Sequence, residues 1–217
     1  MKVITKTALA STVLVVQIAA ICWLIWRYES IVRHGTEVRF RCEAYDPYDP
    51  LRGRYLRTTV RETCPEIVGG MEGHGNMDAA YAKLVPSTNG LWHIAAVAKK
   101  PQSDGELWIK PKWVRIEHSL QWSAKGKDES WEDFQKRRDA SPLAATVALP
   151  DQLFLNEHLA PAAEKVLRDA TSAKGKGAVA VYRARDGEIV ITDIEIDGKS
   201  VIARARENAQ NEVQHER

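Results

Sequence analysis

The stretch that decides the fold covers residues 36–64 and reads TEVRFRCEAYDPYDPLRGRYLRTTVRETC. In its first part, Val38, Phe40 and Cys42 alternate with charged residues. A period of two is typical of a β-strand with one face in the core. The first part therefore predicts a half-buried strand.

The last part of the stretch repeats this alternation, because Leu56 and Val60 share one parity while polar and aromatic residues occupy the other. We expect two neighbouring strands joined by residues 45–55. The connection contains Asp-Pro pairs that begin at Asp46 and Asp49. Proline fixes its own φ and restricts the residue before it, so this loop is predicted to be rigid.

A candidate membrane anchor precedes the strands. Residues 8–26, ALASTVLVVQIAAICWLIW, carry no charge, and Gln17 is their only strongly polar side chain. About 20 apolar residues cross a bilayer as a helix. Trp23 and Trp26 lie at the end where aromatic rings prefer the headgroup level. The apolar run continues well past Ala19 and Ala20, which favours an uncleaved anchor in the lipid bilayer over a signal peptide.

The charges beside this helix give a small orientation bias. Lys2, Lys6 and the amino terminus lie on one side, and Arg27 and Arg33 lie on the other, with Glu29 between them. Basic residues concentrate on the cytoplasmic side, so the expected orientation has the amino terminus inside. Everything after Arg27 is then expected outside the cytoplasm.

Disulfides persist in such a compartment. Of the three cysteines, Cys22 lies in the apolar span, which leaves Cys42 and Cys64 as a candidate bridge. It would close a loop of about 23 residues and stabilise the fold by roughly 3 kcal/mol. The alternative is that both are ordinary buried thiols.

The rest of the chain predicts a mostly β (α+β) domain with one main helical element, residues 151–173. Residues 125–141 are highly charged and fit an insertion or a partly solvated helix, and the glycine-rich residues 65–78 fit a flexible linker. Further strand patterns occur at residues 79–85, 91–98, 107–122 and 177–198, the last with an Asp-Gly hairpin turn.

These features divide the chain into four parts. They are a short cytoplasmic segment (1–7), a transmembrane anchor (8–26), a β-rich extracytoplasmic domain (36–200) and a polar tail of frayed helix or disorder (201–217).

The composition excludes some function classes. The net charge is +2 on 31 basic and 29 acidic residues, so no nucleic-acid partner is expected. The three cysteines and six histidines show no zinc-site or catalytic spacing, so we expect no metal and no cofactor.

The segment YDPYDPLRGRY, residues 45–55, resembles the motif of the GDYXXLXY-domain family of bacterial membrane-anchored proteins. The matching residues are Asp46, Pro47, Asp49, Leu51, Arg52, Gly53 and Tyr55. Arg54 stands where the family has aspartate, and Thr58 and Val60 stand where it has leucine and tyrosine. The resemblance implies a single-pass protein of the bacterial inner membrane, with a periplasmic or extracellular domain that works beside a polytopic membrane protein.

Arginines give the first functional hypothesis, an interaction module. If the two strands pair, their arginines line one exposed face, within reach of phosphates or an acidic partner. The alternative is a solvated face balanced by Glu37 and Glu43. The arginines are Arg39 and Arg41 in the first strand, Arg52 and Arg54 in the loop, and Arg57 and Arg61 in the second strand. The candidate binding residues are Asp46, Asp49, Arg52, Gly53, Tyr55, Arg57 and Arg61.

Two other hypotheses remain open. A cell-envelope enzyme would use Asp46 and Asp49 as paired carboxylates, or Tyr55 beside Arg52 as a proton donor. Aspartate before proline is a common turn device, so no catalytic residue is assigned. A purely structural role in a membrane complex is the third hypothesis.

Overall fold

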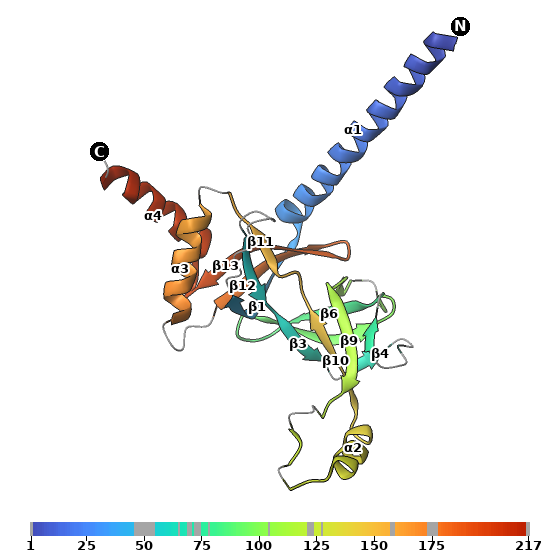
Figure 1. Cartoon of the computed structure of the whole chain (residues 1–217), viewed down its shortest axis with the longest axis vertical. Coiled ribbons are helices and arrows are strands. Elements are labelled where there is room, and N and C mark those ends of the chain that lie inside the picture. The colour runs from blue at the N-terminus through green and yellow to red at the C-terminus, as the bar shows by residue number, and fades with distance from the viewer. Residues whose placement is uncertain are drawn as a thin grey trace.

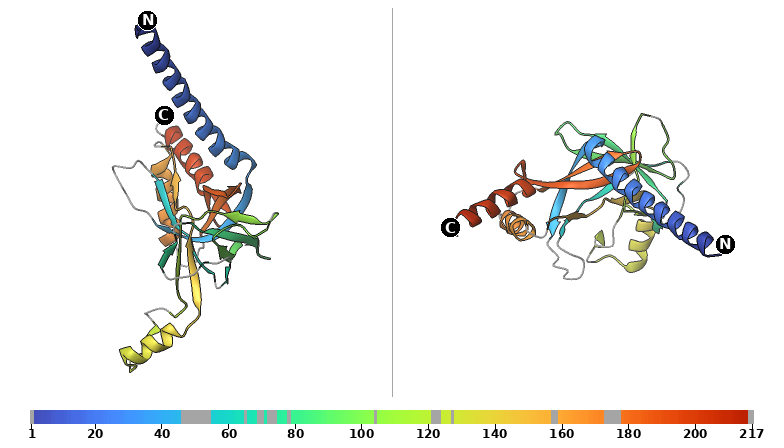
Figure 2. Two further views of the ribbon diagram at one scale, coloured as in Figure 1. Left: turned by 90° about the vertical axis from the view of Figure 1, so that its right-hand side faces the viewer. Right: turned by 90° about the horizontal axis from the view of Figure 1, so that it is seen from above.

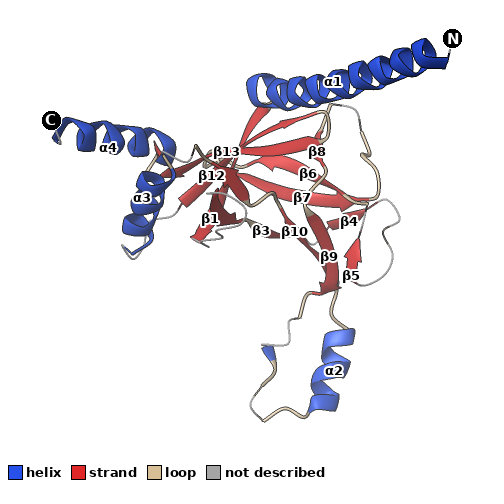
Figure 3. Cartoon of the chain, turned by 45° about the horizontal axis from the view of Figure 1, so that its top comes forward, coloured by secondary structure: helices blue, strands red, loops and turns tan. Residues whose placement is uncertain are grey.

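The computed structural model describes residues 2–45, 55–64, 66–68, 71, 75–77, 79–103, 105–120, 124–126, 128–156, 159–172 and 178–215. A long helix, α1 (Lys2–His34), projects from one end of a β-rich body, and helix α2 (Trp131–Asp139) lies at the opposite end (Figure 1). The mostly β fold expected from the sequence is confirmed, since the strands form the body and the helices lie outside them (Figure 3).

The largest sheet has six strands, in the order β11-β2-β1-β12-β13-β14, and its pairs are antiparallel. The strands in that order are Gln152–Phe154, Tyr55–Thr59, Thr36–Tyr45, Ala178–Arg185, Glu188–Ile196 and Lys199–Ser200. The predicted pairing of the first two strands is confirmed, with Glu43 opposite Thr59 and Tyr45 opposite Arg57.

Two four-stranded sheets complete the body. One has the order β3-β10-β9-β5, with strands Arg61–Cys64, Leu143–Ala148, Trp113–His118 and Gly75–Met77. The other has the order β4-β7-β6-β8, with strands Glu66–Val68, Trp92–Ala98, Tyr81–Pro86 and Leu107–Ile109. Strands β4 and β5 fall within residues 65–78, where the sequence predicted a flexible linker, so that prediction was wrong for these six residues.

The buried side of β1 carries the alternation seen in the sequence. Val38, Phe40 and Cys42 are all buried, and the Phe40 ring meets the Tyr182 ring edge to face at 6.0 Å between centroids. The Tyr182 hydroxyl donates to the Pro150 carbonyl oxygen at 2.9 Å. Burial raises the pKa of this phenol. Tyr182 therefore joins the six-stranded sheet to the chain that leads into β11.

The second run of the opening stretch is not one strand. It divides at Val60 into β2 and β3, which belong to different sheets. Leu56, Val60 and Cys64 are all buried, so the predicted parity was right. Alternation in the sequence predicts which side chains face the core, but it does not predict that the chain passes from one sheet to another.

The β12–β13 hairpin turns at Asp186 and Gly187, both with positive φ (51° and 82°), as the Asp-Gly pair predicted. The main helix was predicted at 151–173, but α3 covers Ala160–Ser172, because residues 152–154 pair with β2 as β11. Pro161 lies in the first turn of α3, where a missing N–H costs little, so it does not break the helix.

The carboxyl-terminal residues form helix α4 (Val201–His215). The sequence had allowed either a frayed helix or disorder for this segment, and the structure has the helix. Val201 and Ala205 are buried in the core. Strands β12 to β14 and α4 thus form one continuous structure at the end of the chain.

Helix α1 meets the body without a linker, because only Gly35 separates it from β1 (Figure 2). The Gly35 N–H donates to the Ile31 carbonyl at 2.8 Å, and the Arg183 guanidinium donates to the Gly35 carbonyl at 3.2 Å. On the next strand, Glu188 pairs with Arg27 at 2.8 Å. The β12–β13 hairpin therefore holds the last two turns of α1.

Gly35→Ala is expected to destabilise the junction. A Cβ on Gly35 would overlap the Ile31 carbonyl oxygen and lie 3.2 Å from the backbone N and O of Ala184. Overpacking of this kind costs about 1–3 kcal/mol. Thermal unfolding in detergent, followed by tryptophan fluorescence, measures the loss. Gly126→Ala is the matched control, since its Cβ would meet only ordinary contacts from 3.4 Å. Equal stability of the two variants would contradict a tight junction.

Candidate functional site

The structure describes only part of the predicted loop site. Asp46, Asp49, Arg52 and Gly53 lie outside the described residues, as does the side chain of Tyr55. The backbone of Tyr55 begins β2 and pairs with Phe154 of β11. The enzyme hypothesis depends on these side chains, so the described residues do not bear on it.

The arginines of the predicted face divide into two groups. Arg39 pairs with Glu37 at 3.2 Å and with Glu195 of β13 at 2.5 Å. At Arg39 the charge is therefore balanced by carboxylates, as the alternative of a solvated face describes. Arg57 and Arg61 behave differently, because they border a pocket together with Lys112.

The pocket forms where the chain passes twice between the six-stranded sheet and the four-stranded sheet β3-β10-β9-β5. One crossing is β2 to β3, at residues 57–61, and the other is β10 to β11, at residues 148–151. The two crossings bond to each other through Thr58 N–H and the Asp151 carbonyl at 2.9 Å. The pocket is open to solvent and has a volume of about 60 Å³.

Asp151 organises one wall of the pocket. Its carboxylate accepts from Lys112 Nζ at 2.6 Å and from Arg57 Nε at 3.1 Å. Its side chain is 14% exposed, whereas those of Arg57 and Lys112 are 44% and 45% exposed, so the carboxylate lies deeper than its two partners. Partial burial alone would raise the pKa of Asp151, but the hydrogen bonds and charges of Lys112 and Arg57 outweigh it and lower the pKa.

Arg61 and Trp113 form another part of the pocket lining. They lie in one row of the neighbouring sheet, with Ala148 of β10 between them. Because Ala148 is small, the Arg61 guanidinium reaches over the Trp113 ring, at 5.9 Å from its centroid. Such a cation–π contact orients the guanidinium without using its N–H donors.

The sequence identified Arg57 and Arg61 but missed Lys112, Trp113 and Asp151. Lys112 lies 39 residues from Asp151, and Arg57 lies 94 residues from it, so no local pattern connects them. Lys112 follows Pro111 and Asp151 follows Pro150. Proline beside a charged residue at the end of a strand is the only local signal, and it is shared with ordinary turns.

The predicted bridge between Cys42 and Cys64 is not formed, since all three cysteines are free thiols. The two residues belong to different sheets. Cys64 donates to the Ala95 carbonyl at 2.9 Å. Burial raises the pKa of both thiols, that of Cys42 to about 12. The alternative interpretation of two buried thiols fits this geometry, and a protonated buried thiol is a poor nucleophile.

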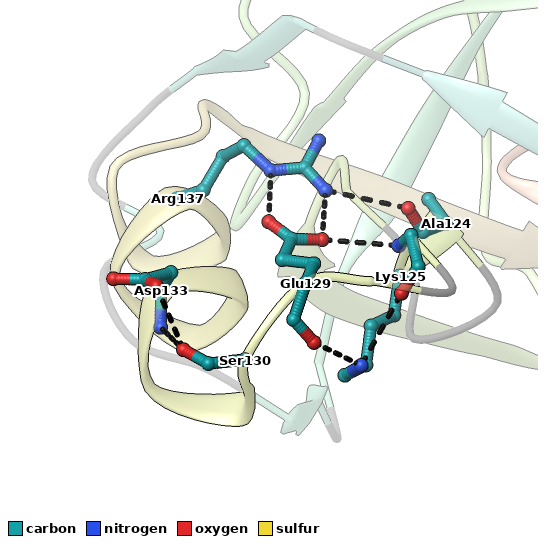
Figure 4. A network of polar contacts seen from close by, with 7 residues as sticks. Ala124, Lys125, Glu129, Ser130, Asp133 and Arg137 are labelled. Carbon is teal, nitrogen blue, oxygen red and sulfur yellow. Dashed lines mark hydrogen bonds and ion pairs between the residues drawn. The ribbon is translucent and has the colours of Figure 1, made fainter.

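Helix α2 and the residues before it form a small unit of their own (Figure 4). The Glu129 carboxylate accepts from Arg137 at 2.8 and 3.0 Å and from Gly126 N–H at 3.0 Å. Ser130 caps the helix by accepting from Asp133 N–H at 3.1 Å. The hydrogen bond from Arg137 is the main cause of the lowered pKa of Glu129. The polar groups of this unit therefore bond mainly to one another.

A comparison with protein families gives one match. The model of a family described as GDYXXLXY protein matches residues 17–202, which is most of the chain. No curated protein and no solved structure matches. Among the described residues, no group of three or more His, Cys, Asp or Glu side chains has the arrangement of a metal site.

Thiol labelling tests the cysteine arrangement. With free, buried Cys42 and Cys64, we expect both thiols to react with maleimide only after denaturation, without a reducing agent. Mass spectrometry of unreduced, denatured protein should then show all three cysteines labelled. The control is the same protein reduced before labelling. A bridge would leave one labelled thiol in the unreduced sample and three in the control.

Asp151→Asn is expected to destabilise the protein at pH 7 by about 1–3 kcal/mol, because it removes the charge shared by Arg57 and Lys112. The folded-state pKa of Asp151 is lowered, so the stabilisation is present above the unfolded-state value near 3.8. It is lost as the pH falls through the lower folded-state value. Chemical unfolding of wild type and variant between pH 7 and pH 3 should therefore show the difference shrinking.

Asp186→Asn is the matched control, because that carboxyl is 85% exposed and, among the described residues, its ion pair is with Arg185 at 3.2 Å. A wild-type stability advantage over Asp151→Asn that stays constant down to pH 3 would contradict a lowered pKa.

Proposed function

The chain belongs to the GDYXXLXY family, and from that premise we propose that it is a single-pass membrane protein whose extracytoplasmic β-rich domain is an interaction module for a polytopic membrane protein. The observation that carries the proposal is the surface of α1. Ser11–His34 is long and apolar enough to cross a membrane, and none of its most apolar 18-residue stretch is buried against the described rest of the chain.

An apolar helix surface of this size needs an apolar environment. The side chains of Leu14, Val15 and Trp26 are 57%, 64% and 68% exposed. Soluble proteins rarely expose apolar patches beyond a few hundred Å². Lipid covers one part of such a helix, and the helices of a membrane partner cover another.

The orientation in this proposal places the amino terminus in the cytoplasm. Lys2 and Lys6 support it, and Arg33 on the opposite side is engaged by Glu29 at 2.6 Å. The compartment of the domain is then the periplasm or the exterior of the cell.

The junction at Gly35 supports the choice of an interaction module over a loosely tethered domain. A flexible linker would leave the orientation of a tethered domain free. Here the hairpin β12–β13 grips the helix through Arg27–Glu188 and through Arg185 Nη1, which donates to Ser30 Oγ at 2.9 Å. A partner that packs on α1 would therefore also set the orientation of the domain.

Photo-crosslinking in living cells tests the proposal. A photoreactive residue is placed at Ile18, on α1, and at Phe154, the exposed residue opposite Tyr55. We expect the Ile18 position to capture one polytopic membrane protein, identified by mass spectrometry. Lys199, an exposed residue of β14, is the control position. Capture at Phe154 as well would extend the contact to the predicted loop region.

The opposing result is a protein that crosslinks at neither position while it remains folded and membrane-bound. In that case α1 would be an anchor covered by lipid alone, without a membrane-protein partner. Protein found entirely in the soluble fraction would overturn the anchor itself.

A further inference from the structure

We propose that the pocket bordered by Arg57, Arg61 and Lys112 binds a phosphate-type oxyanion. The pocket holds three cationic side chains and one carboxylate, Asp151. Its formal charge is therefore about +2 in a space of about 60 Å³. This inference does not depend on the membrane partner proposed above.

The cations keep donors available for a ligand. Asp151 engages Nε of Arg57 and one proton of Lys112. Among the described residues, the terminal nitrogens of Arg57 and the whole guanidinium of Arg61 have no hydrogen-bond partner. Arginine donors pair strongly with phosphate and carboxylate oxygens.

Other exposed arginines provide a contrast. Arg115 lies on β9 two residues from Trp113, and its Nε pairs with Glu117 at 2.9 Å. Arg39 is likewise engaged by two glutamates. Arg61 instead contacts the face of Trp113, and no carboxylate among the described residues forms an ion pair with it.

The arrangement is also preorganised. Asp151 holds Arg57 and Lys112 from the deeper side, so their remaining donors are directed away from it. Ala148, between Arg61 and Trp113 in the sheet, is small enough to let the guanidinium lie over the indole ring. Cations held in place lose less entropy on binding than free side chains do.

Size and geometry select the ligand class. A volume of about 60 Å³ holds several water molecules, at about 15 Å³ for one, and so accepts a single oxyanion group but not a nucleotide. Two of the three cations lie at the two ends of residues 57–61 and the third, Lys112, comes from a distant part of the chain. Three separate cations suit a tetrahedral group with three accessible oxygens. The source of that group is either free phosphate or the phosphate of a lipid headgroup.

Isothermal titration calorimetry of the full-length protein in a neutral detergent tests the site. Inorganic phosphate is titrated at low chloride concentration, and we expect saturable binding to one site. Arg61→Gln should weaken binding at least tenfold. Arg115→Gln, the matched control on the same sheet face, should change it less than twofold. Thermal unfolding of each variant verifies that it is folded.

Ala148→Leu is a second variant, which adds bulk to the pocket lining between Arg61 and Trp113 and removes no charge. It should also weaken binding at least tenfold, which generic attraction to a basic surface does not predict. A short-chain phosphatidic acid, used below its critical micelle concentration, is the lipid arm. Binding of this lipid alone would support the same site with a headgroup as the source.

Three results would overturn the proposal. They are an absence of saturable heat with both probes, unchanged binding in folded Arg61→Gln, and equal losses in Arg61→Gln and Arg115→Gln. The last result would show that phosphate senses the overall charge of the surface rather than this pocket.

Discussion

The structure depends on the pairing of β1 with β12. Thr36 faces Ala184 and Cys42 faces Ala178, so the first strand after the long helix is closed by a strand from the end of the chain. Both other sheets and helix α2 come from the chain between these two strands. The buried contact of Phe40 with Tyr182 lies on this pair, and Tyr182 in turn holds Pro150 at the crossing that builds the pocket. The core pairing and the candidate site are therefore parts of one structure.

Charged residues have two distinct uses in this protein. On the six-stranded sheet and in the α2 unit, most described arginines are matched by a carboxylate, as in Arg39–Glu195 and Arg137–Glu129. Exposed pairs of this kind contribute little to stability but keep a surface neutral. At the pocket between the sheets, three cations and a single carboxylate lie together, and that carboxylate binds two of the three. This local imbalance is invisible in the overall charge of +2.

The sequence predicted those parts of the fold that depend on neighbouring residues. Alternation predicted β1 and the buried parity at Leu56, and Asp186-Gly187 predicted the hairpin turn. The predictions that failed depended on residues far away in the chain. Residues 152–154 became a strand because β2 lies beside them, and Cys64 stays a thiol in a sheet separate from that of Cys42. The candidate site was half predictable for the same reason, since Arg57 and Arg61 are close in sequence but Lys112 and Asp151 are brought to them by the fold.

The one-residue junction at Gly35 gives α1 a fixed helical phase relative to the sheet. Each residue of an α-helix advances the chain by about 1.5 Å and turns it by about 100°. A single insertion or deletion in α1 between its apolar span and Gly35 would therefore swing the whole β-rich body to a different side of the helix axis. The number of residues in this part of α1, and not only their apolar character, is then under constraint. Length variants of the helix would leave every side chain of the domain unchanged, but they would turn the domain to face another direction around the helix axis.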